Sequence, residues 1–390
     1  MKNLRHLLIA VVTYIFISGC TKDGIEKTSD CTGSQNMSHP KSAVFQAVID
    51  KYTNAGLPGI AILIRDKNGL WVSTSGKADI EEGIAMKPCI ISKGASTTKT
   101  FIATLTLLLA EEGKLSLDDK VEKWVSEKVV TEVKNAREST VRMLLNHTTG
   151  IADIIDDQGF YLGVLNNPSH NWTSEELIKF VYGDDAVFPA GTDVEYSNTN
   201  YLLLAMILDK VTGKNHSIAL REKILNPLKL QNSFYFWHDP LPQSTAQGYF
   251  DFYNNGSIVN ITNYNTGSGN GYGGLYTTVY DLQIFIEALV RDKQILKEQS
   301  LNQMLTFTKT DEGYDRANGL GVFKDFLERS PNQFGYGHRG RDLGYTADMY
   351  WFPNQDITMT YLINYGTDAK SELREVFLSF RKEIVDRMME

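Results

Sequence analysis

Apolar and polar positions along the chain predict strands near both ends and helices between them. Residues 58–64 form an almost unbroken apolar run, and an Asn-Gly turn at 68–69 joins them to a second strand-like stretch at 70–72. Four more strand-like segments follow near the C-terminus, at 319–323, 334–338, 346–352 and 357–364. Strands joined by such short turns pair antiparallel. The pattern therefore predicts an α+β fold, in which helices flank an antiparallel sheet from both chain ends and a mostly helical lobe is inserted.

One predicted helix is apolar on every face. Almost every position from Phe101 to Ala110 is apolar or carries a small hydroxyl, and Gly94 and Gly113 stand before and after this run. A helix without a polar face is buried on all sides. We therefore expect this helix at the centre of the folded domain.

The first turn of this helix carries a hydroxyl and an amine, Ser96 and Lys99. Their spacing puts both side chains on one face, with Cβ atoms about 5–6 Å apart. The positive end of the helix dipole disfavours an ammonium there and favours an oxyanion, so Ser96 could be a nucleophile and Lys99 its proton acceptor. Ser-x-x-Lys also occurs at 38–41 and 379–382, but neither place offers the start of a buried helix.

Two further short motifs lie on a predicted loop and at a strand end. Tyr196 and Asn198 precede an apolar helix at 202–211, and such loops hold functional side chains on a rigid base. Tyr-x-Asn also occurs at two other places, so the tripeptide is weak by itself. His338 and Gly340 form the only His-x-Gly of the chain, and a glycine there lets a ligand approach the backbone closely.

The N-terminus has the proportions of an export signal. Basic residues at 2 and 5 precede an apolar run from 7 to 17, which is too short to span a bilayer. The four residues that end at Cys20 resemble a bacterial lipobox, which implies cleavage before Cys20 and its lipidation. An ordinary secretory signal is the alternative. We expect a lipid-anchored protein of the cell envelope that faces the periplasm or the cell surface.

The predicted organisation has three parts, namely a lipoprotein signal peptide at 1–19, a flexible tether at 20–40 and a folded domain at 41–390. The tether is rich in Ser, Thr, Lys, Asp and Gly and cannot contribute a core. Cys31 lies in this flexible segment and Cys89 in the domain, which argues against a structural disulfide between them.

Composition narrows the possible partners. A net charge of −8 gives no basic footprint for nucleic acid. The seven histidines are scattered and no Cys/His spacing matches a zinc site, so we expect no metal and no other cofactor. Beyond the N-terminal run, no apolar stretch of the sequence is long enough for a transmembrane helix.

Ser-x-x-Lys, Tyr-x-Asn and His-x-Gly, in that order, resemble the motifs of the penicillin-recognising serine hydrolases. The tyrosine in the middle motif resembles the branch of class C β-lactamases, D-Ala-D-Ala carboxypeptidases, D-aminopeptidases and related esterases. Supporting stretches lie at 112–119, 144–150 and 273–278, and the likeness covers nearly everything after residue 41. It implies the β-lactamase/DD-peptidase-like fold.

The resemblance also implies catalytic roles. Ser96 is then the acylated nucleophile, Lys99 and Tyr196 share the general-base role, and Tyr196 returns the proton to the leaving group. A tyrosine needs cationic or polarising neighbours to ionise near neutral pH. We expect Lys99 to be one such neighbour and His338 to be the other.

Four residues are implied in substrate binding. Asn198 would hold the substrate's amide, and His338 and Gly340 would lie beside it on the strand. Backbone N–H groups of Ser96 and Arg341 would form the oxyanion hole. We also hypothesise that Arg341 or Arg339 pairs with a substrate carboxylate, with solvated arginines as the alternative.

The expected function is a cell-envelope acyl hydrolase for D-amino-acid peptides or related amides. Class C β-lactamases usually carry Lys-Thr-Gly where this chain has His338, which argues against an efficient β-lactamase. An esterase for small acyl esters and a class C-like β-lactamase are the alternatives, and an inactive binding lipoprotein is the alternative of another class. The sequence leaves open the substrate, the oligomeric state, the membrane face and the role of the Tyr-rich segment 247–280.

Overall fold

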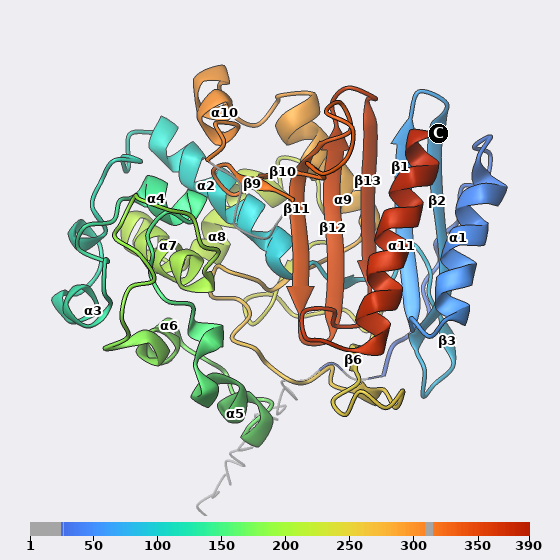
Figure 1. Cartoon of the computed structure of the whole chain (residues 1–390), viewed down its shortest axis with the longest axis horizontal. Helices are drawn as coiled ribbons and strands as arrows, with labels where there is room; N and C mark the ends of the chain where they lie inside the picture. The colour runs from blue at the N-terminus through green and yellow to red at the C-terminus, as the bar shows by residue number, and fades with distance from the viewer. Residues whose placement is uncertain (1–24, 26, 309–314) are drawn as a thin grey trace, which may run out of the picture.

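The computed structural model describes residue 25, residues 27–308 and residues 315–390. The predicted signal peptide and Cys20 lie outside this part, so cleavage and lipidation stay predictions. Among the described helices, none combines the length and the apolar character that crossing a bilayer requires. Figure 1 shows a central sheet with helices on both of its faces.

The main sheet has eight strands in the order β3-β2-β1-β13-β12-β11-β10-β9. Their bounds are β1 Gly59–Asp66, β2 Gly69–Asp79, β3 Ile84–Ala85, β9 Ala317–Asn318, β10 Phe323–Asp325, β11 Gly335–Asp342, β12 Tyr345–Phe352 and β13 Ile357–Ile363. All neighbouring strands are antiparallel, and β1 pairs directly with β13, so that Ile60 lies opposite Ile363. The predicted sheet from both chain ends is confirmed.

Alternating residues of β1 separate two cores. Ile60, Ile62 and Ile64 face the core below α1 (Ser42–Asn54) and α11 (Glu372–Met389), which pack against each other. Ala61 and Leu63 face the opposite core, which the sheet shares with the helical lobe. The remaining α-helices are α2 Thr98–Glu111, α3 Glu127–Glu132, α4 Val141–Asn146, α5 Gln158–Asn166, α6 Ser174–Leu177, α7 Asn198–Thr212, α8 His216–Leu220, α9 Val279–Ile286 and α10 Glu298–Met304. Five short strands form two small sheets: β4 Ser92–Lys93, β5 Phe234–Tyr235, β6 Tyr249–Phe250, β7 Val259–Asn260 and β8 Leu275–Thr277.

Helix α2 is the buried central helix that the sequence predicts. Of its 14 residues, 11 are buried, and Phe101 stacks on Phe285 of α9 with ring centroids 3.5 Å apart. A 3-10 turn at Ala95–Thr97 leads into α2 and contacts β11. α2 therefore runs from the sheet into the helical lobe (Figure 1), and its first turn lies where these two layers meet.

The polar segment before α1 is bound to the domain, which corrects two expectations. Cys31 and Cys89 form a disulfide, although the sequence argued against one. Thr28 donates its N–H to Asp79 and its hydroxyl to the backbone of Thr245. Residues of this segment need no core of their own, because hydrogen bonds and one covalent bond attach them to the domain surface. The described part of the 20–40 segment is therefore held in place and is not a free tether.

Candidate active site

Ser96 and Lys99 meet at the start of α2, as predicted. The backbone φ of Ala95 is 49°, a left-handed value that is uncommon for a residue with a side chain, and Ser96 follows it half-buried. The Lys99 amine lies 3.0 Å from the Ser96 Oγ and donates to Asn198 Oδ1 and to the Tyr272 carbonyl, both at 2.7 Å. A neutral amine that uses its two N–H groups in this way directs its lone pair toward the Ser96 hydroxyl.

Burial makes the neutral amine accessible near neutral pH. Lys99 is fully buried, and this desolvation lowers the pKa of its amine from 10.5 to about 7. The negative charges of Asp153, Asp342 and Asp368 oppose the shift. Lys99 can therefore accept a proton under mild conditions.

Tyr196 completes the cluster from the segment just ahead of α7. Its ring lies under the Lys99 amine, with the nitrogen 4.9 Å from the ring centroid, and stacks on His147 at 4.4 Å. Burial raises the pKa of the phenol, whereas a hydrogen bond with Ser96 and the nearby charge of Arg316 lower it. The structure thus brings Ser96, Lys99 and Tyr196 together.

Asn198 is held from two sides. Its Oδ1 accepts from Lys99, while its backbone N–H and its Nδ2 both donate to Asp153 Oδ2 at 2.9 Å. The amide oriented in this way is already engaged on both ends. The Asn198 side chain therefore binds Lys99, whether or not it also contacts a substrate.

His338 was expected to be a cationic or polarising neighbour of Tyr196, and the cationic role is not met. Its Nδ1 is 2.5 Å from the carbonyl oxygen of Arg339, so Nδ1 carries the proton and Nε2 is an acceptor. Burial, with the nearby Lys99, holds the pKa of His338 well below its usual value, so the ring is neutral. Arg316 is the cation instead, because its guanidinium lies 5.5 Å from the Tyr196 ring centroid.

Gly340 lies directly beside the nucleophile turn. A Cβ at this position would lie 2.2 Å from the carbonyl oxygen of Gly94, two residues before Ser96. Only a glycine lets β11 approach this closely.

The side chains of Arg339 and Arg341 point to the other face of the sheet, which corrects the hypothesis that one of them pairs with a substrate carboxylate. Side chains alternate between the two faces of a strand, so those of Arg339 and Arg341 lie on the face away from His338 and Gly340. Arg339 binds both carboxylate oxygens of Asp325, and Arg341 donates to Asp348 at 2.8 Å. Arg381 of α11 bridges the same two carboxylates. These arginines form a buried ion network between the sheet and α11.

Four site residues were absent from the sequence-derived candidates: His147, Asp153, Tyr272 and Arg316. Tyr272 contributes its backbone carbonyl, which no side-chain pattern reveals. His147 lies within the stretch 144–150 that resembles the family and Asp153 follows it closely, so that likeness was the available signal. In the Tyr-rich segment, Tyr272 lines the site, whereas Tyr249 is in the core below α11 and Tyr253 is 77% exposed.

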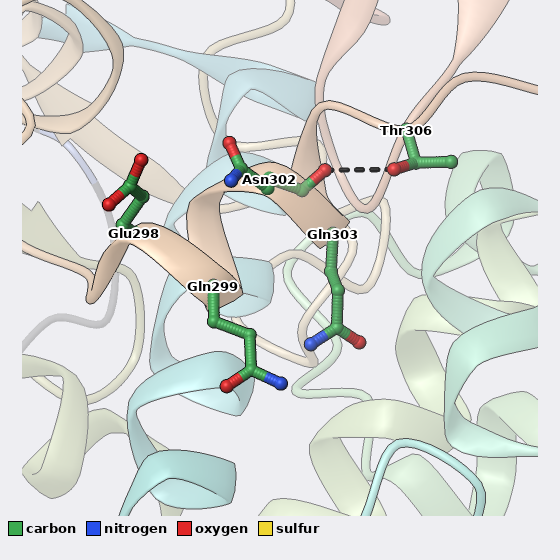
Figure 2. Close-up of a pocket in the computed structure, with 5 residues that line it drawn as sticks. All are labelled: Glu298, Gln299, Asn302, Gln303 and Thr306. Carbon is green, nitrogen blue, oxygen red and sulfur yellow. Dashed lines mark hydrogen bonds between the residues drawn. The ribbon is translucent and has the colours of Figure 1, made fainter.

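The described residues contain no group of His, Cys, Asp and Glu side chains arranged to hold a metal ion. A hollow of about 560 Å³ lies beside α10, and no residue of the cluster just described lines it. Figure 2 draws its lining residues. The hollow is lined by Glu298, Gln299, Asn302, Gln303 and Thr306, and the Thr306 hydroxyl donates to the Asn302 carbonyl. Four of these residues belong to α10 and Thr306 follows it, and none of them belongs to the cluster of Ser96, Lys99 and Tyr196.

The chain is similar in sequence and in fold to several known proteins. The Beta-lactamase family model matches residues 45–378. The solved D-amino acid amidase from Ochrobactrum anthropi SV3 is 25% identical, with a TM-score of 0.77 over 89% of this chain and 97% of that one. Penicillin-binding protein 4* of Bacillus subtilis is 26% identical over 78% of this chain and 67% of its own length. Protein flp of Staphylococcus aureus is 28% identical over 50% of this chain, and the match spans 38% of its length.

Proposed function

The chain belongs to the beta-lactamase family, and from this premise we propose that it is a serine hydrolase that forms an acyl-enzyme at Ser96 on D-amino-acid amides or peptides. The observation that carries the proposal is the meeting of the Ser96 hydroxyl, the Lys99 amine and the Tyr196 phenol in one buried cluster. The intact cluster argues against the alternative of an inactive binding lipoprotein.

The first half of the proposed reaction acylates Ser96. Lys99 accepts the hydroxyl proton as the oxygen attacks the substrate carbonyl, and Tyr196 hands a proton to the leaving amine. Backbone N–H groups of Ser96 and Arg341 stabilise the oxyanion. Water then attacks the acyl-enzyme by the same proton route in reverse.

The open edge of β11 supports this substrate position. β10 pairs with β11 only from 335 to 337, and within the described residues no strand pairs with that edge at 338–342. An extended substrate can add to this edge as a further strand and reach Ser96, because Gly340 lies against Gly94.

The substrate class rests on the relatives and on His338. The D-amino acid amidase is named for the cleavage of D-amino acid amides, and it aligns over most of both chains. Neutral His338 supports amide substrates over those that need a cation at this position. A penicillin-binding activity is the second candidate, because one relative is named Penicillin-binding protein 4*. An esterase would use the same three groups.

A substrate panel tests the proposal. The wild type and Ser96→Ala would be incubated with D- and L-phenylalanine amide, D-alanyl peptides, p-nitrophenyl acetate and a fluorescent penicillin. We expect release of ammonia or amine from the D-substrates and labelling that disappears in Ser96→Ala. Equal rates on D- and L-amides would refute the stereochemical part, and activity that survives in Ser96→Ala would refute the nucleophile.

We also propose export and a lipid anchor at Cys20. The Cys31–Cys89 disulfide supports export, because disulfides persist in oxidising compartments. We expect the wild type in the detergent phase after phase separation and Cys20→Ala in the aqueous phase. A wild type that stays aqueous argues against the anchor.

A further inference from the structure

The carboxylate of Asp153 determines which way the Asn198 amide faces. Its Oδ2 accepts hydrogen bonds from the backbone N and from the Nδ2 of Asn198, both at 2.9 Å. An ionised carboxylate only accepts hydrogen bonds, so the amide must turn its NH₂ group toward Asp153. The amide oxygen then faces Lys99, 2.7 Å from the amine.

A reversed amide would change the chemistry of Lys99. Its NH₂ group would face the amine and donate to the lone pair that Ser96 needs. We propose that Asp153 is a positioning residue that keeps Lys99 competent as the proton acceptor by fixing the orientation of the Asn198 amide. The inference rests on the proposed function, in which Lys99 deprotonates Ser96.

Neighbouring hydrogen bonds hold this arrangement in place. Thr199, which follows Asn198, accepts the Ile154 N–H at 3.0 Å and donates to the Ala152 carbonyl at 2.7 Å. The residues on both sides of Asp153 are thus tied to the first turn of α7. The backbone of Asp153 cannot move away from Asn198 without breaking these bonds.

Charge provides a second effect, which can be separated from orientation. The charges of Asp153, Asp342 and Asp368 act on Lys99, and its amine lies over the rings of Tyr196, Tyr201 and Tyr272. The neutral rings of His147 and His338 and the guanidinium of Arg316 lie around Tyr196. The charges of Asp153 and Asp368 both raise the Lys99 pKa. No hydrogen bond joins Asp368 to Asn198 in the described chain, so Asp368 is the matched control for charge alone.

The experiment compares Asp153→Asn, Asp368→Asn, Asn198→Ala and the double variant Asp153→Asn/Asn198→Ala. Values of kcat and KM would be measured from about pH 5 to 9 on the best amide from the panel. We expect Asp153→Asn to lower the plateau kcat roughly ten- to a hundredfold with KM little changed. The fall of kcat on the acid side of the pH profile should also move to lower pH in Asp153→Asn. Asp368→Asn should move this fall in the same direction and keep the plateau value of kcat.

The double variant separates positioning from general damage. If Asp153 acts through Asn198, its substitution should change the plateau kcat less than about twofold in the Asn198→Ala background. An additive loss, or a wild-type plateau in Asp153→Asn, overturns the inference.

A measurement on the wild type does not depend on turnover. The side-chain amide signals of Asn198, assigned by their loss in Asn198→Ala, should shift as Asp153 titrates, and burial raises the pKa of that carboxyl to about 6. Signals that do not move overturn the inference. A wild type without turnover refutes the proposed function alone.

Discussion

Gly340 lies so close to Gly94 that a Cβ on Gly340 would be 2.2 Å from the Gly94 carbonyl oxygen. This contact joins β11 to the turn that carries Ser96, and backbone atoms cannot move aside as the end of a flexible side chain can. The lack of a side chain at Gly340 therefore sets the distance between β11, which carries part of the proposed oxyanion hole, and the Ser96 nucleophile.

Gly340→Ala should separate β11 from the Ser96 turn. Overpacking of this kind costs about 1–3 kcal/mol of stability, and a displacement near the reacting atoms costs activity of about a hundredfold. The matched control is Gly273→Ala, whose added Cβ would have its nearest neighbours at 3.9 Å. Urea unfolding and kcat/KM measure both effects, and equal behaviour of the two variants would contradict the prediction.

The rate of Ser96 acylation should rise with pH through about 7. Burial lowers the pKa of Lys99 to about 7, and the amine accepts a proton only in its unprotonated form, which increases as pH rises through that value. Stopped-flow measurement of the acylation rate at several pH values tests this rise.

Lys99→Arg is the control for this rise. A guanidinium stays protonated throughout the accessible pH range, so it keeps a positive charge and cannot serve as a base. We expect acylation to fall about 10²- to 10⁴-fold and to lose the rise near pH 7. An unchanged rise in this variant would assign the titration to a group other than Lys99.

The buried arginines should affect stability and leave substrate charge preference unchanged. Arg339→Met leaves the Asp325 carboxylate with fewer partners, and breaking a buried ion pair costs about 3–5 kcal/mol. Because the side chains of Arg339 and Arg341 lie on the far face of the sheet, the ratio of activity on acidic and neutral substrates should stay at the wild-type value. A changed ratio in Arg339→Met or Arg341→Met would restore the carboxylate hypothesis.

Local patterns predicted the elements that carry the site. The unbroken apolar run predicted the buried helix, and the order of three short motifs predicted which distant residues meet there. Asp153 could not be predicted in the same way, because its role depends on which side of the Asn198 amide it contacts. The alternation of side chains along a strand could have predicted that Arg339 and Arg341 lie on the sheet face away from His338, because a strand was predicted there.

The Cys31–Cys89 disulfide shows that the prediction of a free tether, which rested on composition, was wrong for the described part of this segment. A polar segment without aliphatic residues cannot build a core, and that argument holds for residues 27–40. It does not follow that such a segment is free, because backbone hydrogen bonds and a covalent bond can attach it to a core built by other residues. Cysteine pairing depends on tertiary contacts, which the sequence alone does not give.

Reduction of the disulfide should therefore lower the stability of the whole domain. Cys31 and Cys89 are 58 residues apart, and a cross-link that closes a loop of this size contributes about 2–4 kcal/mol, chiefly by restricting the unfolded chain. We expect dithiothreitol to lower the thermal midpoint of the wild type and to leave that of Cys31→Ser/Cys89→Ser, already lowered, unchanged. Ser96 should keep its acylation rate below the new midpoint, because the catalytic cluster uses no residue of the 27–40 segment. A midpoint that does not respond to reductant would show that hydrogen bonds such as that from Thr28 to Asp79 hold this segment without the covalent bond.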